Sequence, residues 1–141
     1  MGQAMTQAID IIRAALQHLR VVDAAAALDE NDTADAIKSL NAMMRAWEAD
    51  GISLGWSDVV AATDAMPSPP EADEAIGYNL AIRLASRFGV QVGADVVSLA
   101  SSGVSLLRAL TASSEYSRCS YEDLPAGNAQ RTGSWREFLY R

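Results

Sequence analysis

The sequence has few of the residues on which enzyme chemistry depends. Its 141 residues include one histidine, His18, and one cysteine, Cys119. A single histidine excludes a histidine-rich metal site, and a histidine-based triad would have to use His18, which we expect instead to lie on a helix surface or at a groove edge. A single cysteine forms no intrachain disulfide, which fits a reducing compartment, and no base near Cys119 in sequence activates it. We therefore expect no catalytic residues, no cofactor and no metal.

Basic residues are also scarce. The chain has 11 Lys and Arg against 18 Asp and Glu, a formal net charge of −7. Non-specific binding of nucleic acid requires clustered Lys and Arg that displace counterions from the phosphates. Because the chain has no such cluster, we expect DNA near this protein to be repelled or ignored.

Long apolar runs are missing as well. No stretch comes near the roughly 20 apolar residues that a membrane span needs. The N-terminus lacks a basic region before its apolar stretch, which Asp10 interrupts. We therefore expect neither a membrane span nor a signal peptide.

What the chain does have is helical patterning around a sizeable apolar content. Hydrophobic residues make up 50% of the chain and aromatic residues only 6%, which suits closely packed helices in one domain. Apolar residues recur at helical spacing in four segments. The fold class we predict is all-α, with four helices: one from Thr6 to Leu19, one capped by Asp32 or Thr33 that ends before Gly51, one from Ser68 to Gly89, and one over residues 94–112.

Several residues mark the ends and contacts of these helices. Gly51 stands where a left-handed C-terminal residue belongs, and Ser68 with Glu71 forms a predicted capping box with Pro69 at the first helical position. Gly103 costs about 1 kcal/mol relative to Ala in a helix, so we expect a neighbouring helix to approach it closely. The apolar face that we expect to be buried on the fourth helix contains Val96, Leu99, Gly103, Leu106, Leu107 and Leu110.

The last segment of the chain has a different character. We divide the chain into a helical domain over residues 1–112 and an extended, polar C-terminal tail over residues 113–141 that ends in a short aromatic segment. Trp135, Phe138 and Leu139 would share one face of a short helix, followed by Tyr140 and Arg141. So short a helix is unstable in water and must dock. It docks either on its own helical core or, as we favour, on a different subunit.

Two blocks carry a resemblance to a known family. The stretch from Leu40 to Gly55 contains Leu40, then Met43-Met44, Trp47 and Asp50-Gly51-Ile52, and a second block begins at Asn79-Leu80. Both blocks resemble the phage head-to-tail adaptor family, which includes the tail accessory factor of phage P22. The order of elements agrees over roughly residues 6–112, and the C-terminal tail does not obviously align. As chemistry alone, the first block is a core anchor followed by a turn.

The resemblance implies a structural role. Such adaptors form a ring on the portal, commonly of twelve copies, and extend the DNA channel toward the next tail or nozzle protein. They help to retain packaged DNA. The resemblance places the protein in the virion neck, after assembly in the host cytoplasm. We expect no binding to a membrane. The expected portal-binding or subunit-binding residues are those of the aromatic tail: Trp135, Phe138, Leu139, Tyr140 and Arg141. The two family blocks are expected to act as scaffold.

The charge distribution adds to this interpretation. Residues 1–112 contain 7 basic and 14 acidic side chains, and residues 113–141 contain 4 of each. We expect the acidic body to line the channel in part, so that DNA slides through without specific binding. Because the helices are short and Ala-rich, we expect a monomer in isolation that becomes a ring on the portal. Two alternatives remain open: a small cell-wall hydrolase carried by the particle, and a small helical regulatory or nucleic-acid-binding protein.

Overall fold

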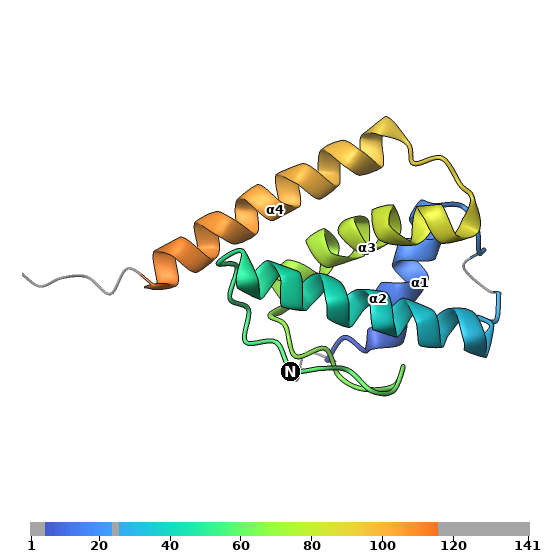
Figure 1. Cartoon of the computed structure of the whole chain (residues 1–141), viewed down its shortest axis with the longest axis horizontal. Coiled ribbons are helices and arrows are strands. Elements are labelled where there is room, and N and C mark those ends of the chain that lie inside the picture. Colours follow the sequence, from blue (N-terminus) through green and yellow to red (C-terminus); the bar gives the residue numbers. More distant parts are fainter. Residues whose placement is uncertain (1–4, 24–25, 116–141) are drawn as a thin grey trace, which may run out of the picture.

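The computed structural model describes residues 5–23 and 26–115 (Figure 1). These residues form four α-helices and one turn of 3-10 helix: α1 (Ala8–His18), α2 (Glu30–Ala49), η1 (Pro70–Ala72), α3 (Asp73–Phe88) and α4 (Ala94–Glu115). The described ranges contain no named strand, only an isolated antiparallel bridge between Gln7 and Ala65. The predicted all-α fold with four helices is confirmed. The tail was predicted to begin at residue 113, but α4 continues to Glu115, and the rest of the predicted tail, residues 116–141, lies outside the described residues.

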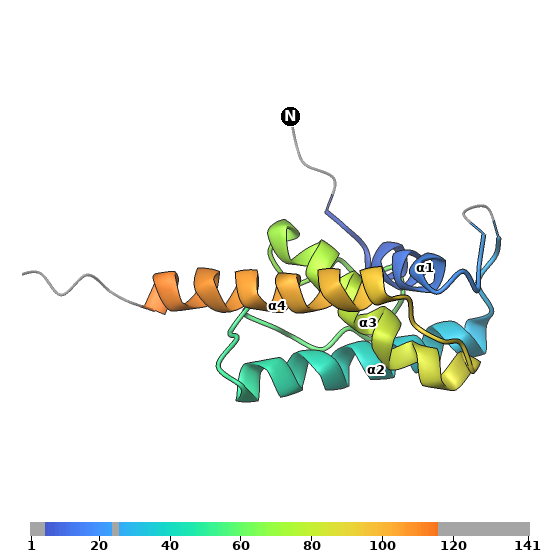
Figure 2. The same cartoon turned by 90° about the horizontal axis from the view of Figure 1, so that it is seen from above.

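The helix α3 lies at the centre of the helical body. It packs against α1, α2 and α4, and Figures 1 and 2 show α4 lying across α3. One apolar core connects the helices. Its largest fully buried side chains are Ile12, Leu16, Leu40, Met43, Met44, Ile52, Ile76, Leu80, Leu84 and Leu107.

The first two helices begin at other residues than we expected. The N-cap of α1 is Gln7 rather than Thr6, and the Gln7 backbone N–H donates to the Asp10 carboxylate at 3.1 Å. The expected caps of α2, Asp32 and Thr33, are wrong, because the helix already begins at Glu30 after Asp29. The acidic stretch is therefore the first turn of α2, where negative charge stabilises the positive end of the helix dipole.

The end of α2 agrees with the sequence prediction. Gly51 has a φ of 88°, in the left-handed region. The Gly51 N–H donates to the Glu48 carbonyl at 3.1 Å and the Ile52 N–H donates to the Trp47 carbonyl at 2.9 Å. This pair of bonds is the Schellman motif, which satisfies carbonyl groups at a helix end. It also turns Ile52 back into the core, where that side chain is 1% exposed.

The start of α3 corrects another expectation. Ser68 makes no capping hydrogen bond, because Pro69 is extended (φ −64°, ψ 145°) and one turn of 3-10 helix precedes α3. The residue before a proline is driven out of the helical region. Pro70 therefore keeps Pro69 extended, which moves the helix start beyond the reach of the Ser68–Glu71 box. The predicted stop at Gly89 is confirmed, with a φ of 62°.

The buried face of α4 is narrower than we predicted. Val96, Ala100, Leu107 and Thr111 are buried. By contrast, Leu99, Leu106 and Leu110 are 45%, 54% and 45% exposed, so the expectation that they are buried is wrong. The spacing of apolar residues identified the apolar face correctly, but among the described helices α3 is the one that packs extensively against α4. One neighbouring helix buries a narrow seam, and a wider apolar stripe needs a second neighbour.

The same helix changes the expectation about membrane spans. Residues Ala94–Ser113 are long and apolar enough, by length and composition, to cross a membrane, and 22% of that stretch is buried. We missed it because Ser and Gly interrupt its apolar residues and leave no continuous run. One such helix is weak support for a membrane span, since helices of soluble proteins meet the same test. Asp95 and Arg108 lie within it.

Candidate interaction surface

The structure places the family blocks mainly in the core. Six of their singled-out residues are buried, from 0% to 9% exposed: Leu40, Met43, Met44, Trp47, Ile52 and Leu80. Gly51 makes the turn described above. Asp50 is exposed and forms an ion pair with Arg108 of α4. A pair this exposed contributes little to stability, so these residues act mostly by packing and by shaping the turn.

A residue that sequence reasoning did not single out fixes the long loop. The Asn41 side chain donates from Nδ2 to the Val59 carbonyl at 2.8 Å and accepts from the Val59 N–H at 3.0 Å. Val59 itself is 3% exposed. The paired bonds satisfy both backbone groups of a buried loop residue, which would be costly to leave without partners. The one sequence feature that could have identified Asn41 is its polar side chain next to the buried Leu40 and close to the buried Met43 on α2.

Asn79 plays a similar part between helices. Its Nδ2 donates to the Ala75 carbonyl at 2.8 Å and to the Ala100 carbonyl at 3.1 Å. The first bond lies within α3 and the second reaches α4. Asn79 thereby joins the two helices through a side-chain bond, which gives this residue of the second family block a clear structural task.

The close approach predicted at Gly103 is confirmed. A Cβ atom at this position would lie 2.7 Å from the Ala75 Cβ and 3.0 Å from the Ala75 Cα. Real Cβ atoms do not come this close to a neighbour. The glycine therefore lets α4 approach the first turns of α3, only one helical turn from the bond that Asn79 donates.

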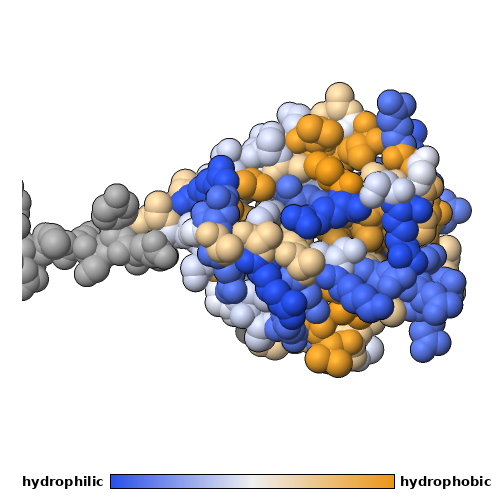
Figure 3. All heavy atoms as spheres, in the orientation of Figure 1, coloured by the Kyte–Doolittle hydropathy of each residue, from blue (hydrophilic) through white to orange (hydrophobic). Residues whose placement is uncertain are grey.

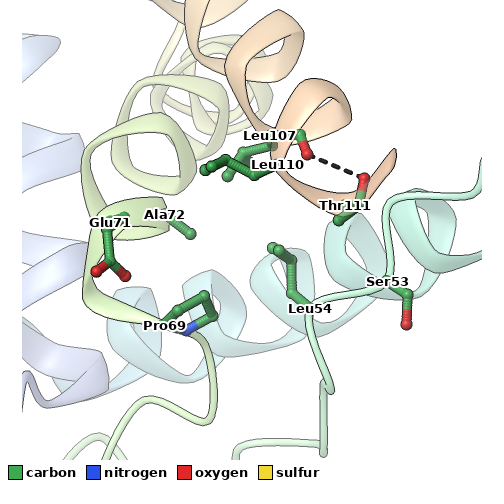
Figure 4. Close-up of a pocket in the computed structure, with 8 residues that line it drawn as sticks. All are labelled: Ser53, Leu54, Pro69, Glu71, Ala72, Leu107, Leu110 and Thr111. Carbon is green, nitrogen blue, oxygen red and sulfur yellow. Dashed lines mark hydrogen bonds between the residues drawn. The ribbon is translucent and has the colours of Figure 1, made fainter. Parts of the chain in front are cut away.

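An apolar hollow opens where α4, the start of α3 and the segment after α2 meet (Figure 4). It has a volume of about 360 Å³. Figure 4 shows Leu54 pointing toward Leu107 and Leu110 of α4, with Pro69 and Ala72 on the adjoining wall. The Thr111 hydroxyl donates to the Leu107 carbonyl at 3.0 Å, so the polar atom on this wall is engaged within its own helix. The hollow is suited to an apolar side chain from outside.

A second hollow continues along the same two helices. It has a volume of about 200 Å³ and is lined by residues of α3 and α4 that include Tyr78, Leu99, Gly103 and Leu106. Glu71 borders both hollows, so the two are neighbours. Together with the exposed leucines they form what we call the α4 face: Leu99, Leu106, Leu110 and the two hollows. In Figure 3 hydrophobic patches interrupt the hydrophilic surface along the upper edge, where α4 lies.

Beside this surface lies the single histidine. His18 stacks on Tyr78 with ring centroids 4.1 Å apart and an interplanar angle of 19°. Burial lowers the pKa of His18, while the nearby carboxylates of Glu74 and Asp95 oppose that effect. His18 thus lies half-buried at the end of α1 with its ring against Tyr78.

Asp73 provides a pH dependence that can be measured. Burial raises the pKa of Asp73 above its ordinary value, although the hydroxyls of Thr6 and Ser68 pull it the other way. Between the unfolded and folded pKa values the folded chain therefore binds more protons than the unfolded chain. The contribution of Asp73 to stability is present at acid pH and is lost as the pH rises above about 4 through the folded pKa.

We therefore expect Asp73→Asn to flatten the dependence of unfolding free energy on pH in this window. Urea unfolding at a series of pH values from acid to neutral measures this. Glu74→Gln, one residue along and exposed, is the matched control and should leave the slope unchanged. An unaltered slope for Asp73→Asn would show that the carboxyl titrates alike in both states.

The remaining predicted features fall into two groups. Within residues 5–23 and 26–115, no three His, Cys, Asp or Glu side chains are placed to hold a metal ion. Cys119 and the predicted docking residues Trp135, Phe138, Leu139, Tyr140 and Arg141 lie outside the described residues. The structure thus brings together scaffold residues and an apolar surface, and the tail prediction stays a prediction.

Comparison with protein families identifies the chain. The family described as P22 tail accessory factor matches residues 1–140, almost the whole chain. The match agrees with the resemblance of the two sequence blocks and extends across the C-terminal tail, which we could not align. It favours a structural component over an enzyme. The chain therefore belongs to the family of P22 tail accessory factors, with a structural role in the tail or neck of a phage particle.

Proposed function

We propose that this protein is a head-to-tail adaptor, which forms a ring on the portal, extends the DNA channel and helps to retain packaged DNA. The observation that carries the proposal is the family match over residues 1–140. A helical body that leaves an apolar surface open supports a role in assembly. The proposed location is the virion neck, after assembly in the host cytoplasm.

The charge of the protein supports the proposed passage of DNA. With a net charge of −7, a ring of copies would repel the phosphates of a genome that moves through it. Lys38, Arg45, Arg87 and Arg108 each form an ion pair with an aspartate. These cations are therefore neutralised locally. We propose that acidic side chains of the helical body line part of the channel and that DNA passes without specific binding.

The ring is proposed to form on the portal rather than in solution. The helical body is small, and the open face of α4 offers less area than a stable standard interface needs, so isolated copies would associate only weakly. We expect the pure protein to be a monomer by multi-angle light scattering and to become a ring, of about twelve copies in this family, when the portal is added. A stable dodecamer without the portal would contradict this prediction.

The C-terminal tail is proposed to bind the portal or a neighbouring subunit. Its last residues contain three apolar side chains at i, i+3 and i+4, namely Trp135, Phe138 and Leu139. With Tyr140 they could bury on the order of 600 Å². That area approaches the roughly 800 Å² per partner of a standard interface. The division into a helical domain and a docking tail rests on this argument.

We expect a chain that ends after Gly127 to bind the portal at least about tenfold more weakly, because most of that apolar area is lost. Co-sedimentation with purified portal rings measures the binding. Trp135→Ala with Phe138→Ala in the full chain is the matched control for the length of the tail and should weaken binding similarly. Portal binding that persists unchanged in both would show that the tail does not dock there.

The decisive test of the proposed function uses particles. Electron microscopy of virions made with and without this protein should show density below the portal only in its presence. Particles that lack the protein should lose packaged DNA and carry no downstream tail or nozzle component. Intact necks and retained DNA in its absence would contradict the proposal.

A further inference from the structure

Large exposed apolar side chains gather on two faces of the described residues. Four lie on α4: Val97, Leu99, Leu106 and Leu110. The other two are Met5, which is 79% exposed, and Val60, which is 85% exposed. We call the second group the loop face: Met5 and Val60. Their segments are neighbours, because the Met66 N–H donates to the Thr6 carbonyl at 2.8 Å and the Ala8 N–H donates to the Asp64 carbonyl at 2.9 Å.

The two faces lie on opposite sides of the molecule. In Figure 1 α4 runs along the upper side, while the middle of the loop between α2 and α3 and the start of α1 lie along the lower side. The two ends of that loop reach α4, where Leu54 and Pro69 line one of the hollows. Figure 2, seen from above, shows α4 in front of the other helices, which agrees with this placement. Figure 3 shows hydrophobic patches at both the upper and the lower edge. Faces on opposite sides suit a head-to-tail contact, in which each copy uses one face for each neighbour.

Charge decides which surfaces two copies can bring together. At a net charge of −7 the copies repel each other, and burying an unpaired charge in a contact is costly. Over residues 96–113 the one charged side chain is Arg108, which is paired with Asp50. Helix α4 therefore brings no unpaired charge to the contact. Glu71 and Glu74 of the neighbouring segment also line the hollows, but both side chains are exposed, so a contact centred on the leucines need not bury them.

The loop face has the same property. Over residues 52–69 the charged side chains are Asp58 and Asp64. Asp58 is paired with Arg45. The Asp64 carboxylate accepts hydrogen bonds from the Val60 N–H at 3.0 Å and the Ala61 N–H at 2.8 Å. These bonds occupy the carboxylate within the loop and fix the turn that presents Val60.

The shapes of the two faces also differ in a complementary way. The α4 face contains two hollows: Leu99 and Leu106 line one of about 200 Å³, and Leu110 lines the other, of about 360 Å³. The loop face presents two protruding apolar side chains, of which Met5 is flexible enough to fill an irregular gap. We propose that the α4 face of one copy receives the loop face of the next, and that this contact repeats around the ring. The inference rests on the proposed ring and names its surfaces.

The size of the contact explains why it needs the portal. A helix of 22 residues is about 33 Å long, and a strip about 10 Å wide along it covers on the order of 300–400 Å². That is below the roughly 800 Å² per partner of a stable standard interface. Copies held side by side on a portal meet at a high effective concentration, at which a weak contact is sufficient.

Cross-linking between two introduced cysteines tests the contact. In a Cys119→Ser background, Leu106→Cys and Val60→Cys are combined in the full chain and assembled on the portal ring of the same phage. A short bismaleimide cross-linker should then give a ladder of covalent multimers. Each single variant should stay monomeric on a denaturing gel. The matched control replaces Leu106→Cys by Ala42→Cys, on an exposed position of α2, and should give no ladder.

The other possible outcomes contradict either the proposed surfaces or the proposed function, and the cross-linking pattern shows which of the two fails. Dimers from Leu106→Cys alone would show a two-fold contact between α4 helices. A ring of normal mass that gives no ladder, or a ladder with Ala42→Cys, would refute these surfaces while the proposed function stands. If no ring forms on the portal even with the unmodified chain, the proposed function itself fails.

Ring formation by a variant with a charge on the α4 face tests the contact independently of cross-linking. Leu106→Glu should weaken ring formation at least about tenfold, because it loses apolar burial and adds a negative charge to an acidic neighbour. Ala42→Glu adds the same charge on α2 and should have no such effect. Both positions are exposed, and circular dichroism should show both variants folded. Equal ring formation by Leu106→Glu and the unmodified chain would overturn the inference.

The same cysteine distinguishes other occupants of the α4 face. If the chain's own tail covered this face, Leu106→Cys would react slowly with a maleimide in the free full-length protein and quickly in a chain that ends after Glu115. If a membrane covered it, the protein would co-sediment with vesicles of phosphatidylethanolamine and phosphatidylglycerol. Either result would overturn the proposal. We expect fast labelling in both chains and no co-sedimentation.

Discussion

Replacing Trp47 with alanine is expected to lower the free energy of unfolding by about 3–5 kcal/mol. Trp47 is 9% exposed and belongs to the central core. Its carbonyl also accepts the Ile52 N–H that turns the chain after α2. Alanine would leave a large cavity at this point, which the surrounding helices can close only in part. Urea unfolding followed by far-ultraviolet circular dichroism measures the loss.

Trp56→Ala is the matched control for this substitution. Trp56 is half-buried and packs against the core from the segment after Gly51. We expect a smaller loss from it, because part of its surface already meets solvent. A nearly neutral Trp47→Ala would instead show that the side chain stabilises a contact with another molecule and not the fold of this one.

Adding a single methyl group at Gly103 is expected to destabilise the protein by about 1–3 kcal/mol. Alanine is favoured over glycine in a helix by about 1 kcal/mol, so helix propensity alone predicts stabilisation. The Ala75 Cβ at 2.7 Å and the Ala75 Cα at 3.0 Å from the new atom reverse the sign. Because the nearer atoms belong to a small side chain and to backbone, α4 has to move away from α3. Thermal or urea unfolding of Gly103→Ala tests this.

A second substitution identifies the cause. Ala75→Gly in the Gly103→Ala background removes the closest atom, so the double variant should be more stable than the sum of the two single effects predicts. Ser98→Ala, on the exposed side of the same helix, should change stability only slightly. If Gly103→Ala were stabilised by the full propensity difference, the close approach of the two helices would be refuted.

The sequence predicted those parts of the fold that depend on neighbours along the chain. The number of helices followed from the spacing of apolar residues. Gly51 and Gly89 marked helix ends because both adopt left-handed conformations that other residues avoid. The start of α3 was wrong because two consecutive prolines delay it, and the start of α2 was wrong because its acidic first turn looked like a linker. These are errors of a few residues within the correct elements.

The interaction surface was less predictable, because it depends on contacts between distant segments. Apolar spacing identified the leucines of α4 but could not tell that one neighbouring helix would leave Leu99, Leu106 and Leu110 exposed. Asn41 bonds to a loop residue 18 positions away, which no local pattern reveals. The distinctive family blocks turned out to contain mostly core residues, so they identified the family and did not locate a binding face.

The one-sided attachment of α4 has a consequence for how the protein comes apart. Because α4 packs mainly on α3, its separation would expose the side chains of that one seam, such as Leu107 and Ala100, and would cost less free energy than unfolding of the whole. Three points resist the separation: the Asn79 bond to Ala100, the contact at Gly103 and the exposed pair of Arg108 with Asp50. Helices α1, α2 and α3 would remain folded around their shared core while α4 swings out. A partner that covers the open side of α4 would therefore oppose this separation and hold the helix on the body.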